Sequence, residues 1–230
     1  MTKVGIMQPY FFPYLGYWQL INAVDRYVVY DDVTYIKGGW INRNNILLEG
    51  KAHLITLPLK SASSFKKIND INIVEKSIEK ILKTIKAAYS KAPYYNQIMP
   101  MVENLFTENS NIALFNYNSV IKICDYLDVK TEIILSSDIE KDNSLRGQTK
   151  VIHINKILGG NIYINAIGGQ KLYNKNDFKQ ENIELKFLQM NDIKYKQFNN
   201  NFIPCLSIID VLMFNNKNEI KQLLNEFNLK

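Results

Sequence analysis

The segment Asp31–Asn44 holds the side chains best suited to chemistry. Two adjacent carboxylates, Asp31 and Asp32, open it, and Arg43 lies between Asn42 and Asn44 near its end. A guanidinium presents a planar pair of donors to a phosphate or carboxylate, while an aspartate can remove a proton, bind a sugar hydroxyl or hold a divalent ion. The pattern favours a catalytic Asp31 or Asp32 and substrate contacts from Asn42, Arg43 and Asn44. The structural alternative is that Asp32 caps a turn and Arg43 pairs with it.

A second candidate segment, 8–17, reads Gln-Pro-Tyr-Phe-Phe-Pro-Tyr-Leu-Gly-Tyr. Aromatic faces stack on a base or a sugar, and glycine lets the backbone approach a phosphate. We therefore expect Gln8, Tyr10 and Tyr17 to bind substrate, together with Tyr35 from the later segment. The alternative is a rigid hydrophobic loop that fills the edge of a sheet.

The strands and the helix expected before and between these two segments predict that the segments lie side by side. Lys3–Met7 is a short apolar run typical of a buried strand, a helix is expected from near Gly16 to Ala23, and Tyr27–Tyr30 is a second buried strand. This order predicts a βαβ unit with two parallel strands. Because parallel neighbours end at the same edge of a sheet, the loop after the first strand should lie beside the two aspartates.

The remainder of the chain is also predicted to consist of strands and helices. Two strand-like runs, 45–48 and 53–59, flank Glu49-Gly50-Lys51 and indicate a hairpin. We expect helices at 74–92, 97–106 and 111–127, a second βαβ unit at 131–135, 149–158 and 161–165, a strand at 185–188 and a helix at 207–214. The sequence thus predicts one domain over 1–230: an α/β fold with a mostly parallel, Rossmann-like (nucleotidyltransferase-like) sheet and a helical insertion at about 74–128.

Ligands of such sheets bind at the carboxyl ends of the strands, which selects four loops: 8–17, 31–44, 136–148 and 166–173. Ser136, Gly168 and Gly169 end presumed parallel strands, and backbone donors there would suit an anion. We include these three residues among the substrate-binding candidates. Ordinary turns are the alternative explanation for the glycines.

Composition narrows the class of partner. The formal net charge is +6 and the pI is about 9.1, but lysines alternate with acidic residues and asparagines along the whole chain. The absence of a compact basic block disfavours nucleic acid and anionic membrane, whereas a phosphate-bearing metabolite fits. No run approaches the roughly 18 apolar residues of a membrane span, and no signal peptide opens the chain, so we expect a cytoplasmic protein without a membrane span.

Metal and thiol chemistry find little support. Two cysteines, Cys124 and Cys205, are too few for a disulfide framework or a zinc site, and we expect both to be buried and reduced. His53 falls in a strand pattern and His153 in a helix pattern, and neither belongs to a recognisable triad. We therefore predict no metal site and structural roles for both histidines.

The combination of motifs resembles the WbqC-like family. The matching pieces are 6–17 (Ile-Met-Gln-Pro-Tyr-Phe-Phe-Pro-Tyr-Leu-Gly-Tyr), 31–35 (Asp-Asp-Val-Thr-Tyr), 42–44 (Asn-Arg-Asn), 88–94, 136–137, 168–169 and 206–210. Two positions depart from the expected pattern, Tyr14 in place of tryptophan and Thr34 in place of glutamine. The resemblance implies a role in making O-antigen or related surface glycans. It supplies no catalytic assignment.

These observations lead to competing hypotheses of function. The first is a transferase that places an acyl or aminoacyl group on the amine of a nucleotide-activated amino sugar, with acyl-CoA or an acyl carrier protein as donor and no resident cofactor. The second is a non-catalytic protein of the same pathway that binds a sugar nucleotide or recruits enzymes. A nucleotidyltransferase-like enzyme is a third hypothesis, disfavoured because Tyr14-Leu-Gly-Tyr17 lacks the histidines of the His-x-Gly-His motif. The oligomeric state is not predicted.

Overall fold

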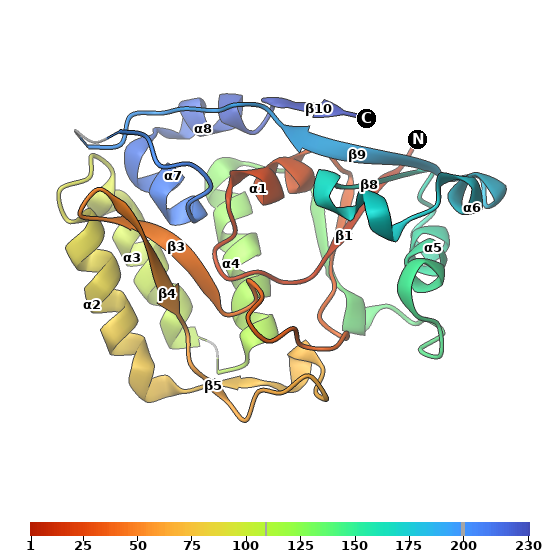
Figure 1. Cartoon of the computed structure of the whole chain (residues 1–230), viewed down its shortest axis with the longest axis horizontal. Helices are drawn as coiled ribbons and strands as arrows, with labels where there is room; N and C mark the ends of the chain where they lie inside the picture. Colours follow the sequence, from red (N-terminus) through yellow and green to blue (C-terminus); the bar gives the residue numbers. More distant parts are fainter. Residues whose placement is uncertain (109, 199–200) are drawn as a thin grey trace.

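The computed structural model describes residues 1–108, 110–198 and 201–230. Its centre is a six-stranded sheet in the order β10-β9-β8-β1-β2-β7 (Figure 1). The strands are β1 (Lys3–Met7), β2 (Arg26–Val29), β7 (Glu132–Leu135), β8 (Ile162–Ala166), β9 (Glu184–Met190) and β10 (Phe227–Leu229). All neighbours pair in parallel except β10, which is antiparallel to β9 at one edge.

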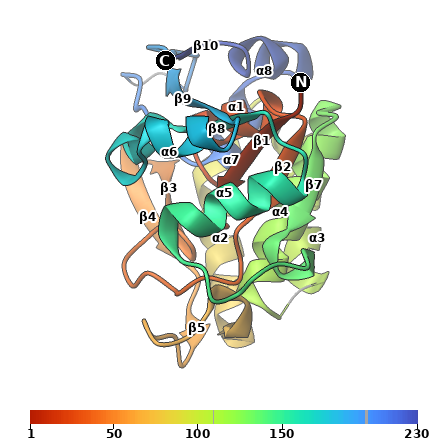
Figure 2. The ribbon, with the colours of Figure 1, turned by 90° about the vertical axis from the view of Figure 1, so that its right-hand side faces the viewer.

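Helices cover both faces of the sheet because the strands are apolar on both sides, as buried parallel strands are. Tyr27 and Val29 of β2 face the larger core, which includes α1 (Leu15–Asn22) and α4 (Ile112–Leu127). Val28, between them, faces the smaller core, which includes α5 (Gly147–Ile157) and α6 (Lys175–Gln180). Figure 2 shows α5 lying across the sheet on this second face.

A long connection between β2 and β7 forms a separate part of the larger core. It contains a hairpin, β3 (Arg43–Leu48) and β4 (Lys51–Thr56), that makes its own two-stranded sheet, and a short pair, β5 (Leu59–Lys60) and β6 (Asn72–Ile73). Helices α2 (Ile78–Tyr89), α3 (Tyr95–Glu108) and α4 follow. The 3-10 turns of the chain are η1 (Ile68–Asp70), η2 (Glu75–Ser77), η3 (Ser136–Asp138) and η4 (Ile167–Leu172).

The carboxyl-terminal part completes the larger core. After β9 the chain runs through an extended stretch to α7 (Ile208–Phe214) and α8 (Lys217–Leu223) before β10. Every residue of α7 is buried, and Ser207 caps its first turn by accepting a hydrogen bond from the Ile209 N–H.

The α/β class, the mostly parallel sheet and the opening βαβ unit are confirmed, with Met7 of β1 directly beside Val29 of β2. Several short elements were not anticipated, among them β6, α6, α8 and β10. One expectation is wrong: Cys124 is buried, but Cys205 is exposed, in a loop where its φ is +56°.

Candidate functional site

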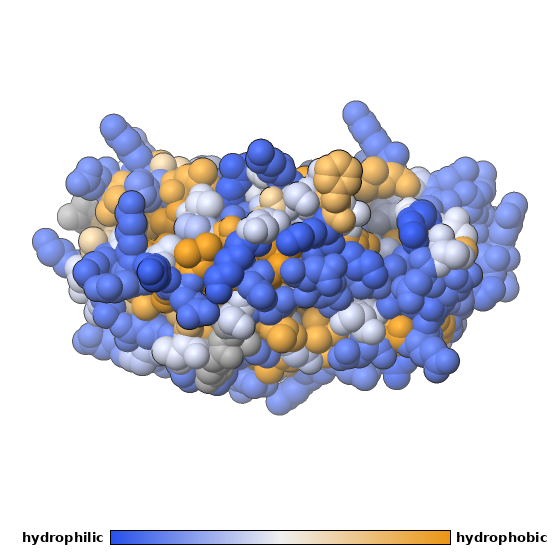
Figure 3. Space-filling view, turned by 90° about the horizontal axis from the view of Figure 1, so that it is seen from below, coloured by the Kyte–Doolittle hydropathy of each residue, from blue (hydrophilic) through white to orange (hydrophobic). Residues whose placement is uncertain are grey.

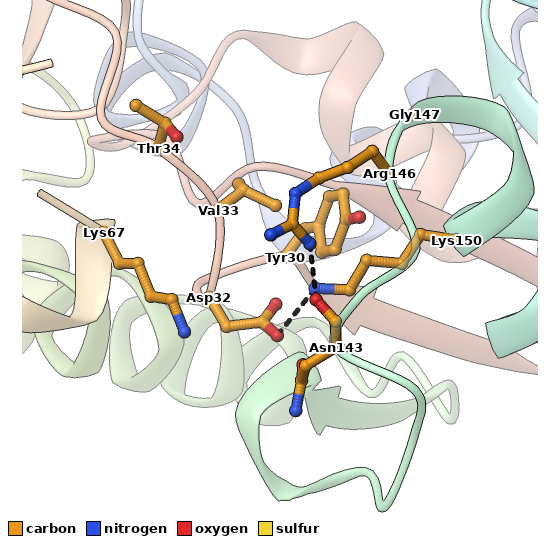
Figure 4. Close-up of a pocket in the computed structure, with 9 residues that line it drawn as sticks. All are labelled: Tyr30, Asp32, Val33, Thr34, Lys67, Asn143, Arg146, Gly147 and Lys150. Carbon is orange, nitrogen blue, oxygen red and sulfur yellow. Dashed lines mark hydrogen bonds and ion pairs between the residues drawn. The ribbon is translucent and has the colours of Figure 1, made fainter. Parts of the chain in front are cut away.

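A cavity of about 180 Å³ opens at the carboxyl ends of β2 and β7 (Figure 4). Three segments supply its walls: the chain that follows β2, the residue before η1, and the loop that enters the first turn of α5. The residues that line it are Tyr30, Asp32, Val33, Thr34, Lys67, Asn143, Arg146, Gly147 and Lys150. The cavity is smaller than the roughly 300–1,000 Å³ typical of pockets that enclose a drug-sized ligand, so it suits one polar group of a larger molecule.

Asp32 is the acidic residue of this cavity, and two lysines hold it. The Lys150 ammonium lies 3.0 Å and the Lys141 ammonium 3.1 Å from the same carboxylate oxygen, Oδ2. All three side chains are at least nine-tenths buried. Removing one partner of a buried ion pair leaves an uncompensated charge, which is costly. The arrangement therefore fixes the loop after β2 against α5.

The electrostatics keep Asp32 ionised. Burial alone would raise the pKa of its carboxyl, but interactions with the Ser136 hydroxyl and with the ammonium groups of Lys150 and Lys141 outweigh burial and lower that pKa. A carboxylate with a lowered pKa is a weak general base near neutral pH. Its principal effect here is to hold two cations at the base of the cavity.

Two polar atoms beside these ion pairs lack hydrogen-bond partners among the described residues. They are Asp32 Oδ1 and Ser136 Oγ, and both are buried. Ser136 is close enough to influence the Asp32 pKa, yet its hydroxyl does not meet hydrogen-bond geometry. The Ser136 hydroxyl lowers the pKa of Asp32 as a hydrogen-bond donor would, so the two groups lie close together and can satisfy one another.

Further positive groups surround the opening. Lys67 and Arg146 line it together with Lys150, and Figure 4 shows these side chains directed toward Asp32 from different sides. The first turn of α5 adds its partial positive charge, because Gly147 at the start of the helix also lines the cavity. Gly147 has a φ of +51°, a conformation that glycine adopts without strain. Cations thus outnumber the single carboxylate.

Tyr30 forms one side of the cavity. The Lys150 ammonium lies 5.4 Å from the centre of its ring, within the range of a cation–π contact. Burial, followed by the nearby Asp32 charge, raises the pKa of the Tyr30 hydroxyl, so it stays a neutral donor at physiological pH. Thr34, one of the two positions that depart from the family pattern, is exposed at the same opening.

Asp31, the other candidate for catalysis, is used within the fold. Its Oδ1 accepts a hydrogen bond from the Ser137 N–H at 2.9 Å, and its Oδ2 accepts one from the Asn69 side chain at 3.2 Å. Asp31 is buried and does not line the cavity. These bonds tie the end of β2 to η3 and η1, which positions Asp32.

The amides proposed to bind substrate also have internal partners. Asn42 accepts a hydrogen bond from the Tyr35 hydroxyl and donates one to the Leu57 carbonyl. Asn44 donates to the carbonyls of Phe11 and Phe12 at 3.0 and 2.8 Å. A buried amide bonded in this way closes the loop in which it lies.

Arg43 reaches back over its own turn. Its guanidinium donates to the carbonyls of Gly38 and Gly39 and lies 5.8 Å from the centre of the Trp40 ring. Asp32 and Arg43 therefore do not pair, and the structural alternative from the sequence is wrong on that point: the cationic partners of Asp32 are lysines.

The first loop is largely filled by its own aromatic residues. Phe11 and Phe12 are fully buried and pack on Phe106 and Phe115 of α3 and α4. The Tyr17 hydroxyl donates to the Gln8 carbonyl, and its ring lies 5.6 Å from that of the half-buried Tyr10.

The sequence led us to expect one pocket lined by Gln8, Tyr10, Tyr17, Asp32, Asn42 and Arg43. That expectation needs correction, because the lining of the cavity includes Asp32 and none of the other five. Gly168 is exposed and Gly169 is buried against the Asn165 side chain, and neither glycine lines the cavity. A role for any of these residues in binding stays a prediction.

The loop 136–148 was among the predicted ligand-binding loops, but the cations in and just after it were not predicted to be site residues. Lys141, Arg146 and Lys150 follow a buried strand, and Gly147 stands just before the helical pattern begins. Basic residues around a glycine at a strand-to-helix junction are typical of an anion site, and that signal was available.

No cluster of three or more metal-ligating side chains occurs among the described residues. None of the described helices has the length and apolar character needed to cross a bilayer.

The fold and the site together define a class: an α/β protein with a central parallel sheet and a cationic cavity at its carboxyl edge. A comparison with known families matches residues 8–222 to the WbqC-like protein family, and the chain belongs to that family. A similar curated protein is the uncharacterized protein Rv1507c of Mycobacterium tuberculosis. It is 28% identical over 218 residues, which cover 92% of this chain and 93% of that protein.

Proposed function

We propose that the cavity between the loop after β2 and the first turn of α5 binds the phosphate of a nucleotide-activated sugar. One observation carries the proposal: Lys67, Arg146 and Lys150 surround a single carboxylate, Asp32, in a cavity that ends at a helix N-terminus. An anionic group neutralises this excess of positive charge and accepts charge-assisted hydrogen bonds from it.

The strand order supports a fold related to nucleotide-binding proteins but not the position of the ligand. Numbered along the chain, the parallel strands β7, β2, β1, β8 and β9 stand in the order 3-2-1-4-5, which is the order of dinucleotide-binding Rossmann sheets. The switch point of such a sheet lies between β1 and β8, whereas the cavity lies at the carboxyl ends of β2 and β7. We infer a Rossmann-like relationship from this order, as a fold-level analogy. The cavity of about 180 Å³ accommodates a phosphate.

A second candidate function adds a reaction: acyl or aminoacyl transfer to the amine of the bound sugar, with acyl-CoA or an acyl carrier protein as donor. In this reaction the amine attacks the thioester carbonyl and the C–S bond breaks. A base accepts the one proton that the nitrogen loses and passes it to the departing thiolate, which leaves as the thiol. The favouring observation is that the Asp32 carboxylate lines the cavity. The lowered pKa of Asp32 makes it a weak base, so this reaction is secondary to the binding proposal.

The two candidates are tested in one series. Thermal-shift measurements with UDP-, dTDP-, GDP- and CMP-linked sugars should identify ligands that stabilise the wild-type protein, with Lys150→Met responding much less. The stabilising ligands that carry a free amine are then incubated with acyl-CoA or acyl carrier protein, and products are read by mass spectrometry. If a nucleotide sugar stabilises the protein but no acylated product appears, the binding function is supported and the transferase function is excluded. Absence of stabilisation by every nucleotide sugar removes the proposal itself.

A further inference from the structure

Three large apolar side chains are exposed at the tips of two loops. Phe65 is 98% exposed, Ile36 is 53% exposed and Trp40 is 42% exposed. Single exposed apolar residues are common on proteins, whereas several together mark an interaction surface. Phe65 lies in a turn, as does the stretch that joins Ile36 to Trp40.

The two loops lie side by side. Thr34 and Lys67 form an antiparallel bridge, and the Tyr35 N–H donates to the Lys66 carbonyl at 2.9 Å. Just beyond these contacts, Ile36 begins one turn and Phe65 belongs to the other. We call residues 36–40 and 64–67 the tip surface. It lies at the lower end of the molecule in Figure 1, and Figure 3, which looks onto that end, shows apolar groups among hydrophilic ones.

The tip surface is strongly basic. Its nine residues include three basic ones, Lys37, Lys66 and Lys67, and no acidic residue. The chain as a whole has 28 basic and 22 acidic residues, so this region departs sharply from the average. Lys37, Lys66 and Lys67 form no ion pair with any described residue.

We propose that the tip surface docks this protein onto an anionic membrane. Phenylalanine, tryptophan and isoleucine at protruding turns enter the boundary between headgroups and acyl chains, while neighbouring lysines remain among anionic headgroups. A second copy of this chain fits less well, because two such surfaces of the same charge repel. The spacing of lysines along the sequence argued against an anionic membrane. The present proposal rests instead on the pairing of loops 33–43 and 63–68 in space.

The placement also links the surface to the cavity. Thr34 and Lys67, which bridge the two loops, line the cavity. Docking would therefore set the cavity opening beside the membrane. The docking proposal stands independently of what the cavity binds.

Vesicle sedimentation tests the proposal directly. The full chain should bind vesicles of phosphatidylcholine with phosphatidylglycerol at low salt, and vesicles of phosphatidylcholine alone only weakly. Phe65→Ser should lower the partition coefficient markedly, and Lys66→Gln by about fivefold, the effect expected for one cation at an anionic surface. Leu172→Ser is the matched control, since Leu172 is 71% exposed on η4, outside the tip surface.

Tryptophan fluorescence gives a second readout. Trp18 is buried and donates a hydrogen bond to the Pro13 carbonyl, so a blue shift on adding anionic vesicles must come from Trp40. Lys150→Met should bind vesicles like the wild type, which separates this proposal from the binding function of the cavity. No binding to anionic vesicles, or equal binding by Phe65→Ser, overturns the proposal. A different partner would also overturn it. That result is a protein that binds no vesicles but dimerises or binds single-stranded RNA, with Phe65→Ser abolishing the dimerisation or the RNA binding.

Discussion

Asp32, after β2, and Lys150, in the first turn of α5, form a buried ion pair of 3.0 Å across 118 residues of sequence. Lys141 completes the arrangement from the connection between β7 and α5. The carboxylate holds both lysines near the base of a cavity whose other charged residues, Lys67 and Arg146, are also positive. The site is therefore organised for an anion, with Asp32 as its internal counter-ion.

Lys150→Met removes one cation and keeps a side chain of similar length. We expect the dissociation constant for a nucleotide sugar to rise about tenfold or more, because a hydrogen bond to a charged group contributes roughly 1.5–3 kcal/mol. Calorimetric titration measures this change. Lys156→Met is the matched control: Lys156 lies in the same helix, is exposed and pairs with Glu181. Equal losses in both variants would show that the effect is unspecific.

Asp32→Asn leaves two buried ammonium groups without their counter-ion. We expect the free energy of unfolding near pH 7 to fall by about 3–5 kcal/mol, as when a buried ion pair is broken. Asp128→Asn is the control. Asp128 also pairs with two lysines, Lys217 and Lys221, but on the surface, and its loss should cost much less.

The same pair predicts a pH dependence. Because the folded protein lowers the pKa of Asp32, the stabilisation is complete above the unfolded pKa of about 3.9 and is lost as the pH falls through the lower folded value. Urea denaturation from pH 6 down to pH 2 should therefore show a steeper loss of stability for the wild type than for Asp32→Asn. Parallel curves for the two proteins would contradict the assignment.

Asn44→Ala tests whether that amide serves the fold. The change leaves the Phe11 and Phe12 carbonyls without their donor, and we expect a loss of about 2–3 kcal/mol in unfolding free energy. Affinity for the nucleotide ligand should stay at the wild-type value. Asn45→Ala, next to it, removes a side chain that makes no hydrogen bond with the described residues, and should cost less. A large loss of affinity in Asn44→Ala would show instead that Asn44 takes part in ligand binding.

Tyr195→Phe examines a buried carboxylate outside the cavity. Asp210 accepts hydrogen bonds from Tyr195 at 2.6 Å, Gln197 at 2.7 Å and Tyr89 at 3.0 Å, and burial raises its pKa. Loss of the shortest bond should cost about 1.5–3 kcal/mol at neutral pH, measured by chemical denaturation. Tyr117→Phe removes a long 3.5 Å bond to the Ile133 carbonyl and should cost less. The reverse order would count against the importance of this network.

The sequence predicted the sheet better than the site, for a physical reason. Strands such as 3–7 and helices such as 111–127 are specified by local periodicity of apolar residues. The partners of Asp32 lie more than a hundred residues away along the chain, where no local pattern points to them. Asp32 itself was chosen correctly as a cavity residue because it follows a buried parallel strand.

The errors at the site and in the fold have different causes. The segment Asn42–Asn44 has polar side chains of the kind that bind ligands, but two of them bond to the carbonyls of buried loops. From sequence alone, an amide that closes a loop and an amide that binds a sugar are indistinguishable. The short helices α6 and α8 were missed because one or two turns give too little periodicity to detect.

The central claim is that the cavity recognises phosphate, and calorimetry with paired ligands tests it most directly. Uridine lacks both the diphosphate and the sugar of UDP-N-acetylglucosamine, whereas UDP lacks only the sugar. The account predicts that UDP binds at least tenfold more tightly than uridine, that this advantage shrinks as salt rises from about 50 to 300 mM, and that Lys150→Met abolishes it. Equal affinities for UDP and uridine in the wild-type protein, or an advantage of UDP that survives in Lys150→Met, would contradict it.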